Sequence, residues 1–352
     1  MGLILFLRFG GNVTGFFRIG DVLPLSPFLP RSEAFIHPDE VGYDGQFFLA
    51  LAYDPLLRQE GTLAALDNPR HRARRILYPA LAHGIALGFP RAVPWALVFL
   101  NMGSAVALVA LLAFGGLREA SGWTLGVLAF QGLWVCLALS TADLLSLVFL
   151  VAALGFHRSR QPWGVAVSLL LASLARDTYL LHAVLFAALS LRERRWREAL
   201  AVAAGQLPAV AWSAWVLVRV PQGNIPVGES FGPPFGGILE AVLRLLRGDL
   251  TGKLLYEGLS LVLLLSVAAM LIWAIIKGAG TAAWCAVPFL VLLAFSRFAV
   301  LDYFVNYTRV FLGLYVLLLL CDGGVWYRRL RTGLLGVSAL ASALYLGRQL
   351  FF

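Results

Sequence analysis

Long apolar runs separated by short polar loops constrain this chain more than any other feature of its sequence. Hydrophobic residues make up 60 % of the 352 residues and charged residues only 13 %, whereas a soluble domain is about 25 % charged. Because a helix that crosses a bilayer needs about 20 apolar residues, we predict an all-α polytopic membrane protein with about 10–11 transmembrane helices. The runs cover about 94–114, 122–139, 142–156, 164–176, 178–191, 198–218, 254–276, 280–296, 304–321 and 333–350.

The N-terminal quarter differs from the rest because it is rich in acidic residues. Residues 18–75 hold eight of the chain's 19 acidic side chains. Two stretches are apolar but too short to cross a membrane: Gln46–Leu57 within this loop and 76–88 directly after it. We predict that both form helices that lie at the interface. The pair of runs at 164–191 is either one bent helix or two short ones. The chain is predicted to begin with a short membrane segment at 1–17, which is either a marginal first helix or the remainder of a truncated one. It continues with an acidic loop at 18–93, a transmembrane module at 94–219, a loop at 220–253 and C-terminal transmembrane helices at 254–352.

Basic residues in the short loops predict the orientation of the chain. Inner loops of membrane proteins carry an excess of Lys and Arg. With the acidic loop outside, the inner loops hold Arg118, Arg158, Arg160, Arg192, Arg194, Arg195, Arg197, Lys277, Arg328, Arg329 and Arg331. The outer turns hold Arg91, Arg176, Arg297, Arg309 and Arg348. The net charge of +9 is therefore typical of topology signals and contact with anionic lipids rather than of nucleic-acid binding.

The stretch from His37 to Pro55 concentrates carboxylates that are costly inside a membrane. Asp44, followed by a flexible Gly45, lies where a helix is predicted to start, and it is our first candidate for a general base. Asp39 and Glu40 form a second, adjacent candidate pair. A structural alternative is that Asp44 simply caps the helix, since Asp is a favoured N-cap residue.

Arginines on the predicted outer face are candidates for binding a phosphate, because the guanidinium fork binds phosphate bidentately. The candidates are Arg72, Arg74, Arg75, Arg176 and Arg309. Two alternatives are structural: a solvated face for the 70–75 cluster, and ion pairs of Arg176 with Asp143 or Asp177 and of Arg309 with Asp302. The cysteines Cys136, Cys285 and Cys321 lie in apolar runs and are read as core residues. The Gly- and Pro-rich stretch 220–236 is predicted to lie over the site as an outer loop.

Several short motifs, in order, resemble the GT-C class of integral-membrane glycosyltransferases. The resemblance is to bacterial relatives of the GPI-anchor mannosyltransferases and to a family associated with cell-surface glycopolymer formation. It covers mostly residues 15–190. The motifs are Tyr43-Asp44-Gly45-Gln46-Phe47-Phe48, Leu51-Ala52, Asp54-Pro55, Leu66-Asp67-Asn68-Pro69, Arg75-Ile76-Leu77-Tyr78-Pro79, Asn101, Ser140-Thr141-Ala142-Asp143 and Leu174-Ala175-Arg176-Asp177. His37-Pro38-Asp39-Glu40 is similar to the first-loop motif of another lipid-linked mannosyltransferase family.

The resemblance implies a GT-C fold in a bacterial cytoplasmic membrane, with the active site facing the periplasm. It implies a polyprenyl-phosphate sugar donor, a glycan, lipid or protein acceptor, inversion at the anomeric carbon and Asp44 as the base. Asp39 and Glu40 are the competing assignment. Asp143 and Asp177 stand where the family pattern has Glu, which puts their roles in doubt. The implied substrate-binding residues are Tyr43, Gln46, Arg75, Tyr78, Asp143, Arg176, Asp177 and Arg309.

No cofactor is required by this scheme, and a divalent metal, Mg²⁺ or Mn²⁺, is left open because a carboxylate can also hold a metal against the leaving phosphate. Two other classes of function compete with a transferase. A transporter or flippase of lipid-linked saccharides would place polar residues along a path through the membrane, whereas here they gather on one face. A non-catalytic membrane partner would keep its function after loss of the first-loop carboxylates.

Overall fold

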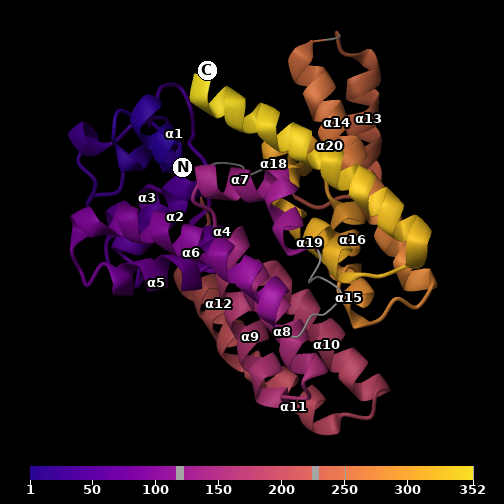
Figure 1. Ribbon diagram of the computed structural model, residues 1–352. Coiled ribbons are helices and arrows are strands. Elements are labelled where there is room, and N and C mark those ends of the chain that lie inside the picture. The colour runs from indigo at the N-terminus through magenta and orange to yellow at the C-terminus, as the bar shows by residue number, and fades with distance from the viewer. Residues whose placement is uncertain (116–122, 224–229, 250, 352) are drawn as a thin grey trace. The chain divides into compact units, whose positions relative to one another are not determined.

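The computed structural model describes residues 1–115, 123–223, 230–249 and 251–351 (Figure 1). Among these residues the only strands are β1 (Ile19–Gly20) and β2 (Ile36–His37), which form a two-stranded parallel pair with Ile19 opposite Ile36. All other regular elements are helices, which confirms the predicted all-α class. Arg118, assigned to an inner loop, and residues 224–229 of the predicted outer loop lie outside the described residues.

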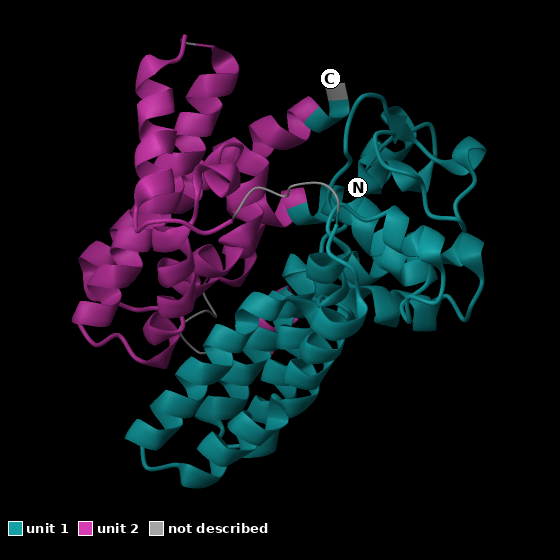
Figure 2. Ribbon diagram, turned by 180° about the vertical axis from the view of Figure 1, so that it is seen from behind, with its two compact units in different colours: residues 1–108, 136–227, 349–352 teal, residues 109–135, 228–348 magenta. Residues whose placement is uncertain are grey.

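The chain forms two compact units, which are coloured separately in Figure 2. The first contains residues 1–108, 136–227 and 349–352, and the second contains 109–135 and 228–348. The boundary differs from the predicted segments, because 109–135 leave the predicted module at 94–219 and join the C-terminal helices. The two units are described in turn.

The first unit begins with short elements rather than a membrane helix. Helix α1 has six residues and is about 9 Å long, so it cannot cross the hydrocarbon core. Gly10 and Gly11 follow it with positive φ angles and turn the chain into η1. The elements up to the first long helix are α1 (Gly2–Leu7), η1 (Val13–Phe17), β1, η2 (Arg31–Glu33), β2, α2 (Asp44–Tyr53), α3 (Glu60–Ala64), α4 (Pro69–Ala73) and α5 (Leu77–Ile85).

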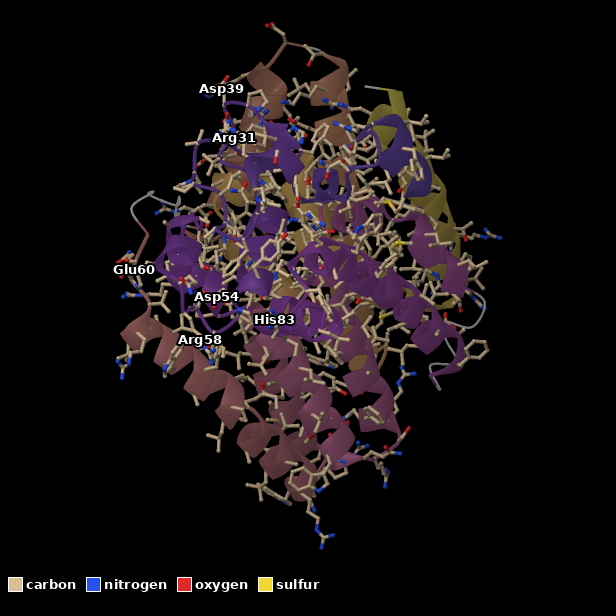
Figure 3. The ribbon with its side chains drawn as sticks, turned by 90° about the vertical axis from the view of Figure 1, so that its left-hand side faces the viewer. Arg31, Asp39, Asp54, Arg58, Glu60 and His83 are labelled. Atoms are coloured by element: carbon tan, nitrogen blue, oxygen red, sulfur yellow. The ribbon has the colours of Figure 1, made fainter. Side chains whose placement is uncertain are left out.

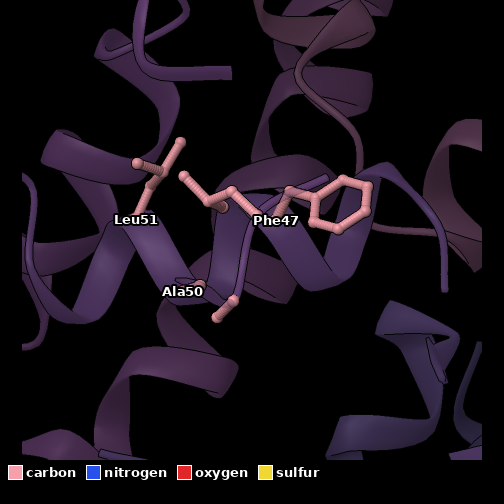
Figure 4. Packing of buried hydrophobic residues seen from close by; sticks show 5 residues of the cluster. Phe47, Ala50 and Leu51 are labelled. Carbon is pink, nitrogen blue, oxygen red and sulfur yellow. The ribbon is translucent and has the colours of Figure 1, made fainter. Parts of the chain in front are cut away.

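Helix α2 is the core of this N-terminal part. All ten of its residues are buried, and Phe47, Ala50 and Leu51 pack against Ala65 and Leu66 (Figure 4). The prediction of an interfacial helix at this position was therefore wrong, because the helix has no face left for lipid. The predicted helix at 76–88 is present as α5, which exposes apolar side chains at Leu81 and Ile85, as an interfacial helix would.

The rest of the first unit is a helical bundle. Helix α9 packs against both α8 and α11. The runs at 164–191 form two helices joined by the short η6, which settles one of the two alternatives. The elements are η3 (Pro90–Ala92), α6 (Val93–Phe114), α7 (Gln131–Ala138), α8 (Asp143–Arg158), α9 (Pro162–Ala175), η6 (Asp177–Tyr179), α10 (Leu180–Arg192), α11 (Trp196–Gly205) and α12 (Leu207–Arg219), with the ends of α6 and α7 crossing the unit boundary.

The second unit is organised around α19, whose nine residues are all buried. Two predicted continuous helices are broken: 304–321 divides at Phe311, and 122–139 divides into a 3-10 helix and α7. The elements are η5 (Thr124–Ala129), α13 (Gly236–Arg247), α14 (Gly252–Ile276), α15 (Thr281–Trp284), α16 (Val287–Phe295), α17 (Phe298–Leu301), α18 (Phe304–Val310), α19 (Leu312–Leu320) and α20 (Gly324–Phe351).

Four helical stretches among the described residues are long and apolar enough to cross a membrane. A stretch of 24 residues rises about 36 Å, more than the roughly 30 Å of a hydrocarbon core. These lengths and compositions indicate an all-helical membrane protein that crosses the bilayer several times. The stretches are Pro90–Phe114, Trp196–Arg219, Gly252–Ile276 and Gly324–Leu350, and the shorter apolar helices are Pro162–Ala175 and Thr281–Phe295.

Candidate functional site

Asp44 is the first residue of α2, and the residue at the N-cap position is Tyr43. The alternative in which Asp44 caps the helix is therefore wrong. A carboxylate in the first turn is still favoured there, because the N-terminal end of a helix carries a partial positive charge. The side chain is buried, with 6 % of the residue exposed, so it needs a partner of opposite charge.

Gly45 positions Asp44 by its lack of a side chain rather than by flexibility. A Cβ at this position would lie 2.4 Å from the carbonyl oxygen of Leu139 and 2.9 Å from Cα of Phe17. Because such contacts are shorter than real Cβ contacts, the start of α2 can approach these two backbone segments only with glycine in this place.

The next element of the site is the sharp start of α4. Asn68 is its N-cap and accepts a hydrogen bond from the backbone N–H of His71 at 3.0 Å, and Pro69 follows in the first turn. Both are favoured in these positions. Asp67 accepts a hydrogen bond from the backbone N–H of Asn68 at 2.6 Å. The Asp67-Asn68-Pro69 motif thus fixes the start of a five-residue helix, which presents Arg72 to Asp44.

Arg72 joins two buried carboxylates. It donates to Asp67 through Nε at 2.8 Å and Nη2 at 2.7 Å, and to Asp44 through Nη1 at 2.6 Å. Its guanidinium also lies 4.5 Å from the centre of the Phe47 ring. The two-point contact with Asp67 holds the guanidinium in place, so the single contact with Asp44 can be exchanged without moving the arginine.

Arg74 and Arg75 connect α4 to the turn between α9 and α10. Both contact the carboxylate of Asp177 at 3.3 Å, and Arg75 lies 4.0 Å from Asp44. The two arginines also face opposite nitrogens of the His71 ring, Arg74 at 3.1 Å and Arg75 at 2.8 Å. A neutral imidazole accepts at only one nitrogen, so one of these two contacts is not a hydrogen bond.

The arginines shift the pKa values of two neighbours. The guanidinium of Arg75, burial and the guanidinium of Arg72 lower the pKa of His71 far below its ordinary value of 6.5, so the ring is neutral at neutral pH. Burial raises the pKa of Asp177, but Arg75 and Arg74 outweigh it and lower this pKa below its ordinary value of 3.8. The neutral imidazole of His71 therefore lies between the guanidiniums of Arg74 and Arg75, which also face the ionised carboxylate of Asp177.

Asp143 and Arg176 form a separate ion pair between the start of α8 and the end of α9. Both residues are buried. This is one of the structural pairings that the sequence left open for Arg176. The pair lies next in sequence to Asp177, so the turn after α9 contributes to both the ion pair and the arginine cluster.

Asp39 and Glu40 are not part of this cluster. Glu40 forms a bidentate ion pair with Arg18 at 2.8 and 3.0 Å. Asp39 is exposed, has a φ of +58° and donates its backbone N–H to Asp21, which also contacts Arg31. Figure 3 shows Asp39 and Arg31 in one part of the first loop. The structure thus brings Asp44 into the arginine cluster and leaves the rival pair outside it.

Two of the predicted substrate-binding residues are engaged with the protein. Tyr78 is fully buried, and its hydroxyl donates to the carbonyl oxygen of Leu97 at 2.8 Å. Gln46 accepts a hydrogen bond from the backbone N–H of Gly20 at 2.8 Å. Both side chains tie helices and strands together in this conformation. Tyr43 is half-buried directly beside Asp44.

Arg309 lies in α18 of the second unit, and it is buried. The other predicted site residues belong to the first unit. Arg309 therefore lies in a different unit from Asp44.

Sequence reasoning missed two members of the cluster as site residues, Asp67 and His71, and it named Arg72 only as one of five candidate arginines. The Asp-Asn-Pro start of α4 was the available signal. It fixes where the helix begins, and a turn just after the helix, in which the Arg75 N–H donates to the Arg72 carbonyl oxygen at 3.1 Å, keeps Arg72 and Arg75 together.

A divalent metal does not fit this cluster. Among the described residues, no group of three His, Cys, Asp or Glu side chains could hold a metal ion. Each carboxylate of the cluster already faces a guanidinium, and cations close to the same oxygens disfavour a second positive charge.

In comparisons with known proteins, no protein-family model, no curated protein and no solved structure matches this chain.

Proposed function

We propose that this protein is a GT-C type membrane glycosyltransferase that moves a sugar, such as mannose, from a polyprenyl-phosphate donor to a glycan, lipid or protein acceptor. One observation carries the proposal: a buried carboxylate, Asp44, shares a cluster with the guanidiniums of Arg72 and Arg75. Such a cluster combines the two groups that the reaction needs, a proton acceptor and a phosphate-binding site.

In the proposed reaction, Asp44 accepts the proton of an acceptor hydroxyl while that oxygen attacks the anomeric carbon. The bond between the anomeric carbon and the phosphate oxygen breaks, and its electron pair leaves with the polyprenyl phosphate. The leaving phosphate gains a negative charge, which Arg72 and Arg75 stabilise. Attack opposite the leaving group inverts the anomeric configuration.

The pairing of Asp44 with Arg72 fits an exchange of partners. A phosphate that approaches Nη1 of Arg72 competes with Asp44 for this donor, while Asp67 keeps the guanidinium in place through two other hydrogen bonds. Asp44 is then released from the arginine and becomes a better proton acceptor. Donor binding would thus activate the base.

The proposal includes the finer membrane arrangement. Shorter apolar helices such as Pro162–Ala175 would add to the four long ones, to give about 10–11 membrane segments. The protein would lie in a bacterial cytoplasmic membrane with the cluster facing the periplasm. The first-unit loop would contact membrane lipids through the exposed apolar residues of α5.

The test is transfer of labelled sugar from polyprenyl-phosphate donors by purified protein. We expect Asp44→Asn to lower transfer by at least about 100-fold, the range for loss of a general base, while the thermal unfolding midpoint shows a folded protein. Glu60→Gln, which changes an exposed carboxylate at the start of α3, is the matched control. Asp39→Asn and Glu40→Gln test the rival pair, and EDTA tests a need for metal.

Absence of transfer by the wild-type protein would reject the transferase, and normal transfer by folded Asp44→Asn protein would reject Asp44 as the base. Loss of transfer in the Asp39 or Glu40 variants alone would move the base to the rival pair. Movement of the donor across vesicle membranes without sugar transfer would instead identify a flippase.

A further inference from the structure

A cavity of about 190 Å³ lies in the first unit, at the far end of α2 from Asp44. Tyr53, the last residue of α2, lines it together with Phe28, Glu33 and the start of α6 at Trp95. Tyr53 lies nine positions after Asp44 along the helix, which corresponds to a rise of about 14 Å. The cavity is therefore distinct from the arginine cluster but connected to it by one rigid, buried helix.

Aromatic rings form two walls of this cavity. Phe28 stacks on Tyr53 with ring centres 6.0 Å apart, and Trp95 stacks on Phe99 with ring centres 5.8 Å apart. In both pairs the planes are inclined by 25°. Phe28 and Trp95 are still 37 % and 39 % exposed. Flat apolar faces that stay open to a cavity suit a ligand with an apolar face of its own.

Polar groups at the rim complement these walls. The carboxylate of Glu33 is about half exposed, and Arg91 lies 3.7 Å from it. The hydroxyl of Tyr53 forms no hydrogen bond with any residue that the structure describes. Burial, together with the nearby charge of Glu33, raises the pKa of Tyr53 to about 12, so the hydroxyl keeps its proton. A carboxylate acceptor and a phenol donor suit a ligand that carries several hydroxyl groups.

The size of the cavity limits the ligand to one ring. A cavity of about 150 Å³ accommodates benzene, so about 190 Å³ accommodates a single six-membered ring with substituents. The carboxylate of Glu33 disfavours a phosphate headgroup. A pyranose ring combines an apolar face for stacking with hydroxyls for Glu33 and Tyr53.

We propose that this cavity binds a neutral pyranose ring of the acceptor glycan, remote from the sugar that reacts at Asp44. The role as an acceptor subsite rests on the proposed transferase function. Binding of a remote ring would hold the acceptor chain against α2 and so present its hydroxyl to the base, which is how distant contacts assist a reaction.

The test is a binding measurement that needs no donor and no transfer. The full-length protein is placed in lipid nanodiscs free of alkyl glycoside detergents, because these detergents carry the same ring. Methyl α-mannopyranoside and methyl α-glucopyranoside are then titrated by saturation-transfer NMR. We expect saturable binding of at least one of them, weakened about tenfold or more by Glu33→Gln, since a hydrogen bond to a charged group is lost.

Two further variants and two matched controls define the site. Tyr53→Phe removes only the hydroxyl, and Trp95→Leu removes a stacking face, so each should weaken binding. Glu60→Gln and Trp163→Leu change an exposed carboxylate and a 71 % exposed tryptophan elsewhere in the first unit, and both should bind as wild type does.

Absence of pyranoside binding, or binding that Glu33→Gln, Tyr53→Phe and Trp95→Leu leave unchanged, would overturn the inference. A phospholipid that native mass spectrometry finds on wild-type protein but not on Trp95→Leu, without pyranoside binding, would assign the cavity to lipid. The outcomes separate the two proposals. Pyranoside binding without any transfer by wild-type protein rejects the transferase alone, and transfer by wild-type protein without pyranoside binding rejects the subsite alone.

Discussion

The two ends of α8 lie beside two groups of buried charged residues of different design. At its start, Asp143 pairs with Arg176 next to the arginine cluster of α4. At its end, His157 contacts Glu198, which accepts a hydrogen bond from Ser190 at 2.7 Å. Arg195 completes this second cluster by donating to the backbone carbonyl of His157 at 2.9 Å.

The second cluster is closed. The side chains of His157 and Glu198 are only 2 % and 3 % exposed, and they join the neighbouring helices α8 and α11. In each cluster one arginine is more exposed than the buried carboxylates, Arg74 at 29 % and Arg195 at 24 %. The clusters differ in what they join: His157 and Glu198 tie the last turn of α8 to the first turn of α11, whereas the arginines of the first cluster come from a short helix and the turn after it. Charges between bundle helices stabilise the bundle, whereas charges on short connecting elements can exchange partners with a ligand.

The largest expected effect is that of Arg72→Met in the first cluster. This change leaves Asp44 and Asp67 buried without their common cation, which costs about 3–5 kcal/mol of unfolding free energy. Chemical denaturation of the purified protein measures it. Arg58→Met, on the exposed turn that Figure 3 labels, is the control and should change stability by less than about 0.5 kcal/mol. Equal stability of the two variants would show that the Arg72 contacts contribute nothing to the fold.

Glu198→Gln in the second cluster should have a smaller effect on stability and none on transfer. The amide keeps an acceptor for Ser190 but loses the charge that faces His157 and Arg195, at a cost of about 1.5–3 kcal/mol. Parallel denaturation and transfer assays test this. If the folded variant transferred sugar as poorly as Asp44→Asn, the second cluster would be part of the reaction and the contrast between the two would fail.

The effect that develops most gradually is a dependence of stability on pH that originates at His71. Its pKa is lowered in the folded protein, so between the ordinary value of 6.5 and this lower value the unfolded chain binds a proton that the folded chain does not. Stability is therefore complete above pH 6.5 and falls by about 1.4 kcal/mol per pH unit below it. The lowered pKa of Asp177 makes stability depend on pH only below its ordinary value of 3.8. Measurements between pH 4.5 and 7 therefore exclude the contribution of Asp177.

Denaturation curves across this window, for wild type and His71→Gln, measure the effect. The variant should lose most of the dependence on pH, and His37, whose pKa is also lowered by burial, accounts for the remainder. A dependence that is unchanged in His71→Gln but disappears in His37→Gln would move its origin from the arginine cluster to the first loop.

Helices were predicted well where apolar runs are long, because burial of an apolar stretch in a membrane or a bundle requires backbone hydrogen bonds within the same segment. Predictions failed where the environment decides. Helix α2 reads as a surface helix, yet all its residues are buried because α5, η1 and α4 pack against it. The run at 304–321 reads as one helix, yet it breaks at Phe311.

The candidate site was predicted in part. Asp44 and the arginines of 70–75 were named from residue type, but sequence alone does not show which arginine points inward. Adjacent residues can also be separated, as Asp39 and Glu40 show, since Glu40 is held by Arg18 and Asp39 turns outward with a positive φ. Tyr78, also named from a motif, is fully buried, and its hydroxyl donates to the carbonyl oxygen of Leu97.

The contact between Arg75 and Asp177 joins residues that are 102 positions apart in the chain. At a synthesis rate of about 5–20 residues per second, Asp177 follows Arg75 by about 5–20 s. During this interval the nascent chain carries an arginine-rich segment whose later partner does not yet exist. The α4 region can therefore reach its final state only after α9 has been made, which makes the closure of this cluster a late step of biogenesis.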